Sequence, residues 1–167
     1  MTREANNSVV SALALMLCFL AGCERNTHVK IEGRDTPIFV LSGSGRLAGL
    51  TVYSPDFGEK AKSPWDKDFA LWEIELKGGR SSAQTLGELG RITYGSVPNG
   101  YEQLKPSVGS APPLREGEKY SYEVDTNNAT GASGYIEIRN SRAVATDGPD
   151  TCFGGEGKKW VRVPCPQ

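Results

Sequence analysis

Short stretches in which apolar and polar residues alternate recur along this chain, and each predicts a β-strand with one buried face. The clearest spans residues 70–76, where Trp72 and Ile74 share one face and Glu73 and Glu75 share the other. Other apolar or alternating stretches lie at 29–31, 38–41, 47–53, 92–94, 101–104, 120–124, 136–138 and 143–145. Many short strands at this spacing predict an all-β fold, an antiparallel β-sandwich or barrel.

Turn-forming residues separate these stretches and support the strand assignments. Turns rich in Gly, Asn, Ser and Pro are predicted at 42–45, 97–100, 127–134 and 140–141. The segment 56–68 is predicted to be irregular. Residues 81–89 are ambiguous: Ser82 is a candidate N-cap for a short helix that Gly90 would end, but a glycine lies inside the stretch.

A leucine, a glycine and a tyrosine follow one another at a distinctive spacing, at Leu114, Gly117 and Tyr120. This segment is similar to the tyrosine corner of fibronectin type III and immunoglobulin-like domains, with Glu116 where fibronectin-type domains often carry proline. The resemblance implies that the leucine packs into the core and that the tyrosine hydroxyl bonds back to the backbone. It favours an Ig-like sandwich with Trp72 as its central tryptophan, and leaves another antiparallel sandwich or barrel open.

The N-terminal segment has the character of an export signal. An apolar run at 9–20 has the length of a signal-peptide core and is too short to cross roughly 30 Å of hydrocarbon as a helix. The motif Leu20-Ala21-Gly22-Cys23 resembles the lipobox of bacterial lipoproteins, although Glu4 offsets Arg3 in a weak basic region. The resemblance implies cleavage before Cys23 and attachment of fatty acyl chains to it, and two or more chains anchor a protein stably.

This interpretation divides the chain into three parts. Residues 1–22 are a lipoprotein signal peptide, 23–27 are the lipidated cysteine with a short tether, and 28–167 are a single β-sandwich domain. Glu24, rather than aspartate, follows the lipidated cysteine. Bacteria with two membranes usually pass such lipoproteins to the outer one. We therefore expect a lipid-anchored protein of the cell envelope, on the outer membrane, facing the periplasm or the surface, where the source has two membranes.

The chain has four cysteines. Cleavage of the expected signal peptide would remove Cys18, and acylation would modify Cys23. Cys152 and Cys165 remain, and outside the cytoplasm two thiols so close in sequence are expected to form a disulfide. Such a bridge would pin a C-terminal hairpin and contribute about 3 kcal/mol by closing a loop. A redox or metal pair is disfavoured, because there is no Cys-x-x-Cys spacing and the single histidine, His28, lies far away.

Charge and motifs predict neither a nucleic-acid partner nor a cofactor. The formal net charge of −1 gives the chain no positive potential that would attract nucleic acid. Ser42–Gly45 lacks both the nucleophile-elbow and the phosphate-loop spacing, so a turn is predicted there. Asp125–Gly131 has oxygen donors at its first and third positions only, which favours a turn over a calcium loop, and no metal site is predicted.

Two groups of residues remain as candidates for function. The tryptophans Trp65 and Trp160 lie among polar residues, where they could stack on a sugar or anchor a protein, or else pack as lids over sheet edges. Carboxylates near one another in sequence could supply a glycosidase acid and base, or simply form a solvated strand face. These carboxylates are Asp66, Asp68, Glu73 and Glu75.

No complete catalytic set is assembled in the sequence, so the first hypothesis is a non-enzymatic envelope lipoprotein. It would bind a protein or glycan partner near the membrane through Trp65 and Trp160. The alternatives are a carboxylate-dependent hydrolase that acts on envelope sugars, and an inhibitor or structural lipoprotein.

Overall fold

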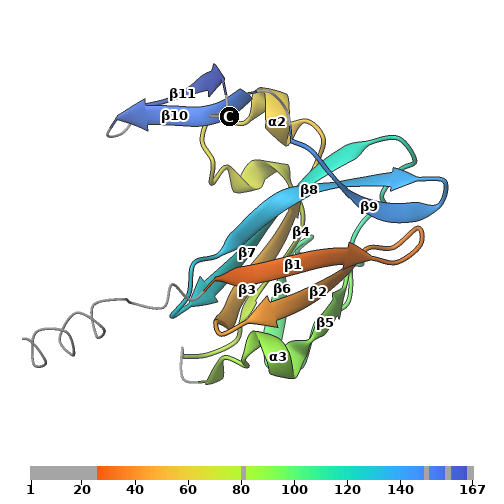
Figure 1. The fold of residues 1–167 in the computed structure, drawn as a ribbon, viewed down its shortest axis with the longest axis vertical. Coiled ribbons are helices and arrows are strands. Elements are labelled where there is room, and N and C mark those ends of the chain that lie inside the picture. Colours follow the sequence, from red (N-terminus) through yellow and green to blue (C-terminus); the bar gives the residue numbers. More distant parts are fainter. Residues whose placement is uncertain (1–25, 80–81, 149–150, 157–158, 165–167) are drawn as a thin grey trace, which may run out of the picture.

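A computed structural model describes residues 26–79, 82–148, 151–156 and 159–164, and its regular structure consists mostly of antiparallel strands (Figure 1). A three-stranded sheet has the order β1 (Thr27–Glu32), β2 (Ile38–Gly43) and β5 (Arg91–Thr93). A six-stranded sheet has the order β6 (Tyr101–Lys105), β4 (Ala70–Leu76), β3 (Arg46–Tyr53), β7 (Lys119–Asn127), β8 (Ala132–Arg139) and β9 (Arg142–Thr146). The predicted all-β sandwich is thereby confirmed.

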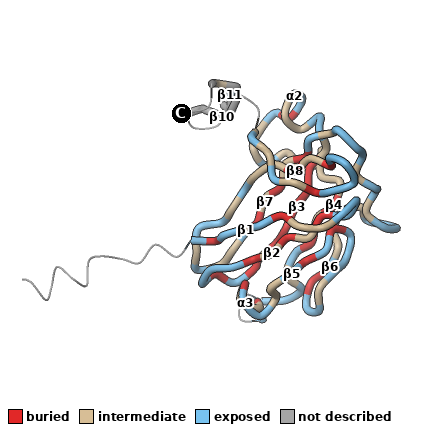
Figure 2. Tube along the Cα trace, turned by 45° about the vertical axis from the view of Figure 1, so that its right-hand side comes forward, coloured by how far each residue is buried: buried red, intermediate tan, exposed pale blue. Residues whose placement is uncertain are grey.

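The two sheets enclose one hydrophobic core, which Figure 2 shows as the buried strands of both layers. Phe39 of β2 meets Tyr122 of β7 edge to face, with ring centroids 5.4 Å apart. Trp72 of β4 is fully buried and meets Tyr94 in the same geometry, also at 5.4 Å. The alternation at 70–76 therefore buries the face that the sequence predicts, because a β-strand sends successive side chains to opposite sides.

Part of the strand order can be compared with that of an immunoglobulin-like sandwich. In that fold one sheet contains strands A, B and E, and the other places C between C′ and F, with G beyond F. The order β1-β2-β5 reproduces the first sheet, and β4-β3-β7-β8 reproduces the second. The strands β6 and β9 extend the larger sheet at its two edges. Trp72 lies on the strand in the C′ position rather than on C.

The predicted tyrosine corner is present at the start of β7. The Tyr120 hydroxyl accepts the Arg115 backbone N–H at 2.8 Å and donates to Glu118 Oε2 at 2.6 Å. Gly117 has φ +78° and donates its N–H to the Ile138 carbonyl, which ties the corner to β8.

The departure of the corner from the fibronectin pattern has a structural reason. The carboxylate of Glu116 accepts the backbone N–H groups of both Asn140 and Ser141. These two residues form the tight turn between β8 and β9, and both have positive φ, as two-residue hairpin turns require. Proline at 116 could not make this contact, so the glutamate fixes the hairpin.

The ambiguous segment forms a short helix, α3 (Leu86–Leu89), and Gly90 ends it as predicted, with φ +58°. Its N-cap is Thr85, not Ser82. Thr85 and Glu88 form a reciprocal capping box in which each side chain accepts the backbone N–H of the other residue. The Ser82 hydroxyl instead donates to the Gly79 carbonyl, because the chain turns there before the helix begins.

The irregular segment after β3 contains two short turns, the helix α2 (Phe57–Lys60) and the 3-10 turn η1 (Lys67–Phe69). Phe57 stacks on Tyr53 at 4.2 Å and meets Phe69 at 6.4 Å. These ring contacts hold the segment 54–69 against the six-stranded sheet, on the face turned away from the sandwich core (Figure 1).

A C-terminal hairpin of β10 (Thr151–Glu156) and β11 (Lys159–Pro164) forms a separate two-stranded sheet. The hairpin is the one predicted, with Cys152 opposite Val163 in its register. The proposed partner, Cys165, and the side chain of Cys152 lie outside the described part of the chain. The disulfide therefore stays a prediction.

Candidate functional site

The outer face of the six-stranded sheet gathers polar side chains on its central strands. Strand pairing places Thr51 of β3 between Glu73 of β4 and Glu123 of β7 in one row. The next row places Gly49 between Glu75 and Asp125. Side chains on this face point away from the core because residues on either side of them in each strand fill it.

One lysine joins the strands of this face. Lys67, at the start of η1, donates to Thr51 Oγ1 at 2.8 Å and lies 3.2 Å from Glu73 Oε1. Its ammonium is also 4.0 Å from Glu123 Oε2 and 5.4 Å above the Tyr53 ring. A single cation is therefore shared between two carboxylates and an aromatic face. It holds the segment 54–69, which we call the covering segment, against the sheet.

Burial sets the protonation of the neighbouring groups. The Tyr53 hydroxyl donates to Glu123 Oε2 at 2.9 Å. Burial, reinforced by the Glu123 charge, raises the pKa of Tyr53 well above its usual value, so the phenol remains a donor. Burial also raises the pKa of Glu123, with the Asp125 charge adding to the effect. Folding thus disfavours the ionised form of this carboxyl group.

Two hollows adjoin one another where the segment 54–69 meets the sheet. One has a volume of about 390 Å³ and is lined by Pro55, Glu59 and Lys119 among others. The second, of about 200 Å³, is lined by Tyr53, Phe57, Pro64, Glu123 and Ser133 among others. Ser121 and Tyr135 line both hollows. We call the pair the Tyr135 site.

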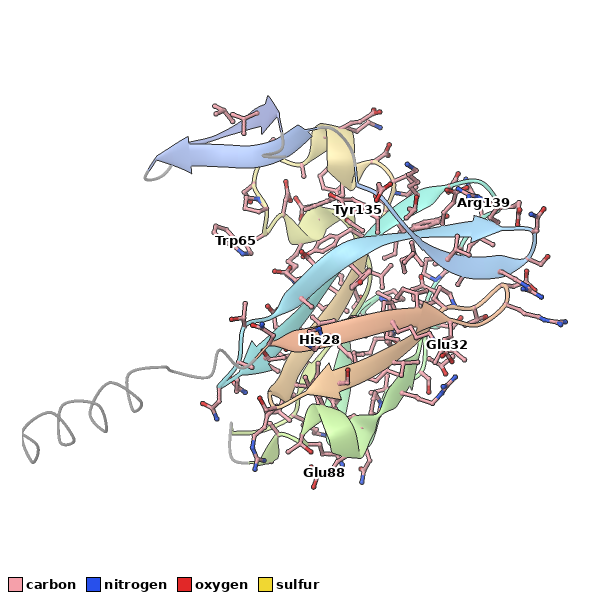
Figure 3. The ribbon with its side chains drawn as sticks, in the orientation of Figure 1. His28, Glu32, Trp65, Glu88, Tyr135 and Arg139 are labelled. Atoms are coloured by element: carbon pink, nitrogen blue, oxygen red, sulfur yellow. The ribbon has the colours of Figure 1, made fainter. Side chains whose placement is uncertain are left out.

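Two features distinguish the Tyr135 site from an ordinary surface depression. The hydroxyl of Ser121 is buried, yet no described residue gives it a hydrogen-bond partner. The Tyr135 ring lies against Gly148, where any Cβ would collide with it, so the chain after β9 holds this ring in place. Figure 3 shows Tyr135 on β8, below the covering segment.

The fold keeps only part of the predicted carboxylate group together, because Glu73 and Glu75 line one hollow on the outer face of the sheet. Asp66 accepts the backbone N–H groups of Lys62 at 3.0 Å and Asp68 at 3.4 Å, so its carboxylate serves the local turn. The acid that meets Glu73 across the sheet is Glu123, from β7. The sequence placed Glu123 on the outer face of a strand, but the pairing of β3 with β7 was needed to find this neighbour.

The predicted tryptophan pair is described only in part. Trp65 is 59% exposed, and in Figure 3 it lies at the outer edge of the covering segment, on the same side of the sheet as Tyr135. Trp160 belongs to β11, and its side chain is outside the described residues, as is all of Cys23. The sequence did not single out Tyr135, whose partners in the site are distant in the chain.

The remaining sequence motifs lie in turns or at exposed positions of strands. Ser42 and Gly43 end β2, and Ser44 and Gly45 form the turn to β3. The chain turns between β7 and β8 within the loop considered for calcium. His28 lies exposed on β1, opposite Ser42. Among the described residues, no group of three His, Cys, Asp or Glu side chains is arranged to hold a metal ion. Within the same residues, no helix has the length and hydropathy needed to span a membrane.

Comparison of the chain with protein-family models, with curated proteins and with solved structures finds no match.

Proposed function

We propose that this chain is a lipid-anchored binding protein of the bacterial cell envelope, without catalytic activity of its own. The observation that carries the proposal is the Tyr135 site, a partly enclosed pair of hollows over strands that are each paired on both sides. Lys67 donates a hydrogen bond to Thr51 and lies beside Glu73 and Glu123. These contacts hold the covering segment against the sheet and so stabilise the surface on which a ligand would bind. Ligand sites are commonly hollows of this size with a few converging polar groups.

The anchoring half of the proposal rests on the lipobox at Leu20–Cys23. Strand β1 begins at Thr27, four residues after Cys23, so the tether is short and the domain would stand close to the membrane. Growth with labelled palmitate should label the wild-type chain in the membrane fraction. Cys23→Ala should be unlabelled and should leave that fraction. A wild-type chain that keeps its leader, or a mature terminus without acyl groups, would refute the anchoring.

The proposed binding activity is tested with the mature protein immobilised through its N-terminus, the end at which the lipid anchor is proposed. Envelope extracts and purified envelope glycans are passed over wild type and over Trp65→Ala, with Val108→Ala as a matched control. Val108 is 87% exposed on the loop that follows the edge strand β6, and it lines neither hollow of the Tyr135 site. We expect saturable retention by wild type and by the control, and weaker retention by Trp65→Ala. Absence of any saturable partner would argue against a binding protein.

A carboxylate-dependent hydrolase is the second candidate, and one observation favours it. Glu123 has a raised pKa and faces Glu73 across β3, and a general acid needs such a raised value. Release of reducing ends from envelope sugars by wild type, abolished in Glu73→Gln and in Glu123→Gln, would establish this activity. Absence of release in wild type would leave the binding protein as the better account.

A further inference from the structure

We propose that the Tyr135 site binds an uncharged carbohydrate, with one sugar unit in each hollow and the Tyr135 ring between them. The inference rests on the proposed function and selects a glycan rather than a protein as the partner. Both hollows are lined by the same tyrosine, and each is large enough for a small ring. Pro55 and Pro64 supply rigid apolar walls, one in each hollow.

The polar groups of the site match a ligand rich in hydroxyl groups. The buried Ser121 hydroxyl reaches no described partner, and a sugar hydroxyl at this position would supply one. Glu123 uses Oε2 for Tyr53 and Lys67, and no described residue bonds to its Oε1. That oxygen is an acceptor for a ligand hydroxyl. Aromatic and apolar surface combined with a few fixed acceptors is the usual composition of a small-ligand site.

The charges of the site favour a neutral ligand over a phosphate or a polyamine. The larger hollow is lined by one acid, Glu59, and one base, Lys119. In the smaller hollow, Glu123 lies 4.0 Å from the ammonium of Lys67. An acid and a base line the larger hollow, and Lys67 offsets the charge of Glu123 from outside the smaller one, so little net field is left for an ion of either sign.

The architecture also disfavours an extended peptide as the ligand. Peptides that bind to sheets usually add a strand to an unpaired edge, where main-chain groups are free. The strands under the Tyr135 site are β3, β7 and β8, and each is paired on both sides. A ligand at this site must therefore be recognised by side chains, as a sugar ring is.

The test is isothermal titration of the mature protein with defined neutral oligosaccharides. The probes are hexamers of β-1,4-linked glucose, β-1,4-linked N-acetylglucosamine, α-1,4-linked glucose and β-1,4-linked mannose, with inorganic phosphate and spermine as charged comparators. At least one hexamer should bind wild type, and the charged probes should not. Tyr135→Ala should weaken that binding at least about fivefold, because an aromatic contact and its buried area are lost.

Further variants separate lost contact from lost folding. Tyr135→Phe keeps the ring and should bind within about twofold of wild type, because the proposed contact is made by the ring and not by the hydroxyl. Gly148→Ala pushes the ring aside without removing it and should weaken binding in the same direction as Tyr135→Ala. Val108→Ala serves as the unaffected control. Circular dichroism of each variant establishes that it is folded.

Each negative outcome has a distinct meaning. If no hexamer binds and an envelope protein is retained by wild type, the carbohydrate inference fails and the proposed function stands. If neither binds, both fail. Binding of a hexamer that Tyr135→Ala and Gly148→Ala leave unchanged would place the sugar elsewhere and overturn the assignment of the site. Tighter binding of phosphate or spermine than of any hexamer would overturn the ligand class.

Discussion

Replacing Tyr120 by phenylalanine tests whether the tyrosine corner stabilises the sandwich. The change removes one hydroxyl and keeps the buried ring, so packing in the core is preserved. The hydroxyl accepts from Arg115 N at 2.8 Å and donates to Glu118 Oε2 at 2.6 Å. Arg115 and Glu118 would both lose the hydroxyl as a hydrogen-bond partner, at the point where the chain enters β7.

The expected cost follows from the two bonds. A neutral hydrogen bond contributes roughly 0.5–1.5 kcal/mol and one to a charged group roughly 1.5–3 kcal/mol. The Glu118 side chain is 37% exposed, so water replaces part of its lost bond and the lower end of the range applies. We expect Tyr120→Phe to reduce the free energy of unfolding by about 2 kcal/mol. For a chain of this size that is a decrease in Tm of about 4–8 °C.

Urea unfolding followed by tryptophan fluorescence measures this difference, with an unchanged m-value as the sign that the native and unfolded states are otherwise alike. Tyr122→Phe is the matched control. Tyr122 is buried two residues along the same strand, and no described residue hydrogen bonds to its hydroxyl, so we expect a cost below about 0.5 kcal/mol. Equal costs for the two variants, or none for Tyr120→Phe, would refute the reasoning.

The same residue predicts a dependence on alkaline pH. Burial and the bond to Glu118 raise the pKa of Tyr120 to about 12, above the value near 10 of an unfolded tyrosine. The native state therefore retains this proton more tightly, and its contribution to stability is complete below pH 10 and declines toward pH 12. The difference between wild type and Tyr120→Phe should narrow across that interval.

Three further changes have defined outcomes. Thr85→Ala removes the capping box of α3 and should lower the free energy of unfolding by about 1 kcal/mol in urea titrations. Glu123→Gln should raise the free energy of unfolding at pH 7 and match wild type at pH 3, because the raised pKa means that ionisation of this carboxyl group opposes folding. Gly43→Ala should lower the Tm, at a cost above about 1 kcal/mol, because φ is +118° and a Cβ would collide with the Asn26 carbonyl.

Local patterns predicted much of this fold because they depend on neighbours in the sequence. The alternation around Trp72 identified β4 and its buried face, and the spacing of Gly117 and Tyr120 identified the corner before β7. The turn at Asn140-Ser141 was also readable, because Asn and Ser are common turn residues, and the structure shows both with positive φ. Each of these features is determined within about ten residues of chain.

The features that the sequence did not reveal depend on long-range pairing. Glu73 and Glu123 become neighbours only because β3 lies between β4 and β7. The Tyr135 site needs the segment after β3 to fold back over β7 and β8, which no local pattern specifies. The cap at Thr85 was missed for a different reason. Ser82 is an equally good capping residue by type, and only the partner at Glu88 distinguishes the two.

The position of β1 has a mechanical consequence. A membrane tether at Cys23 would pull on this strand, while the opposing load would come from whatever the outer face of the six-stranded sheet holds. β1 is aligned with β2 over six consecutive pairs, from Thr27 opposite Gly43 to Glu32 opposite Ile38. A force directed along the strand would load all of these pairs together in shear, so a domain anchored in this way would bear tension without the pairs separating one by one from the N-terminal end of β1.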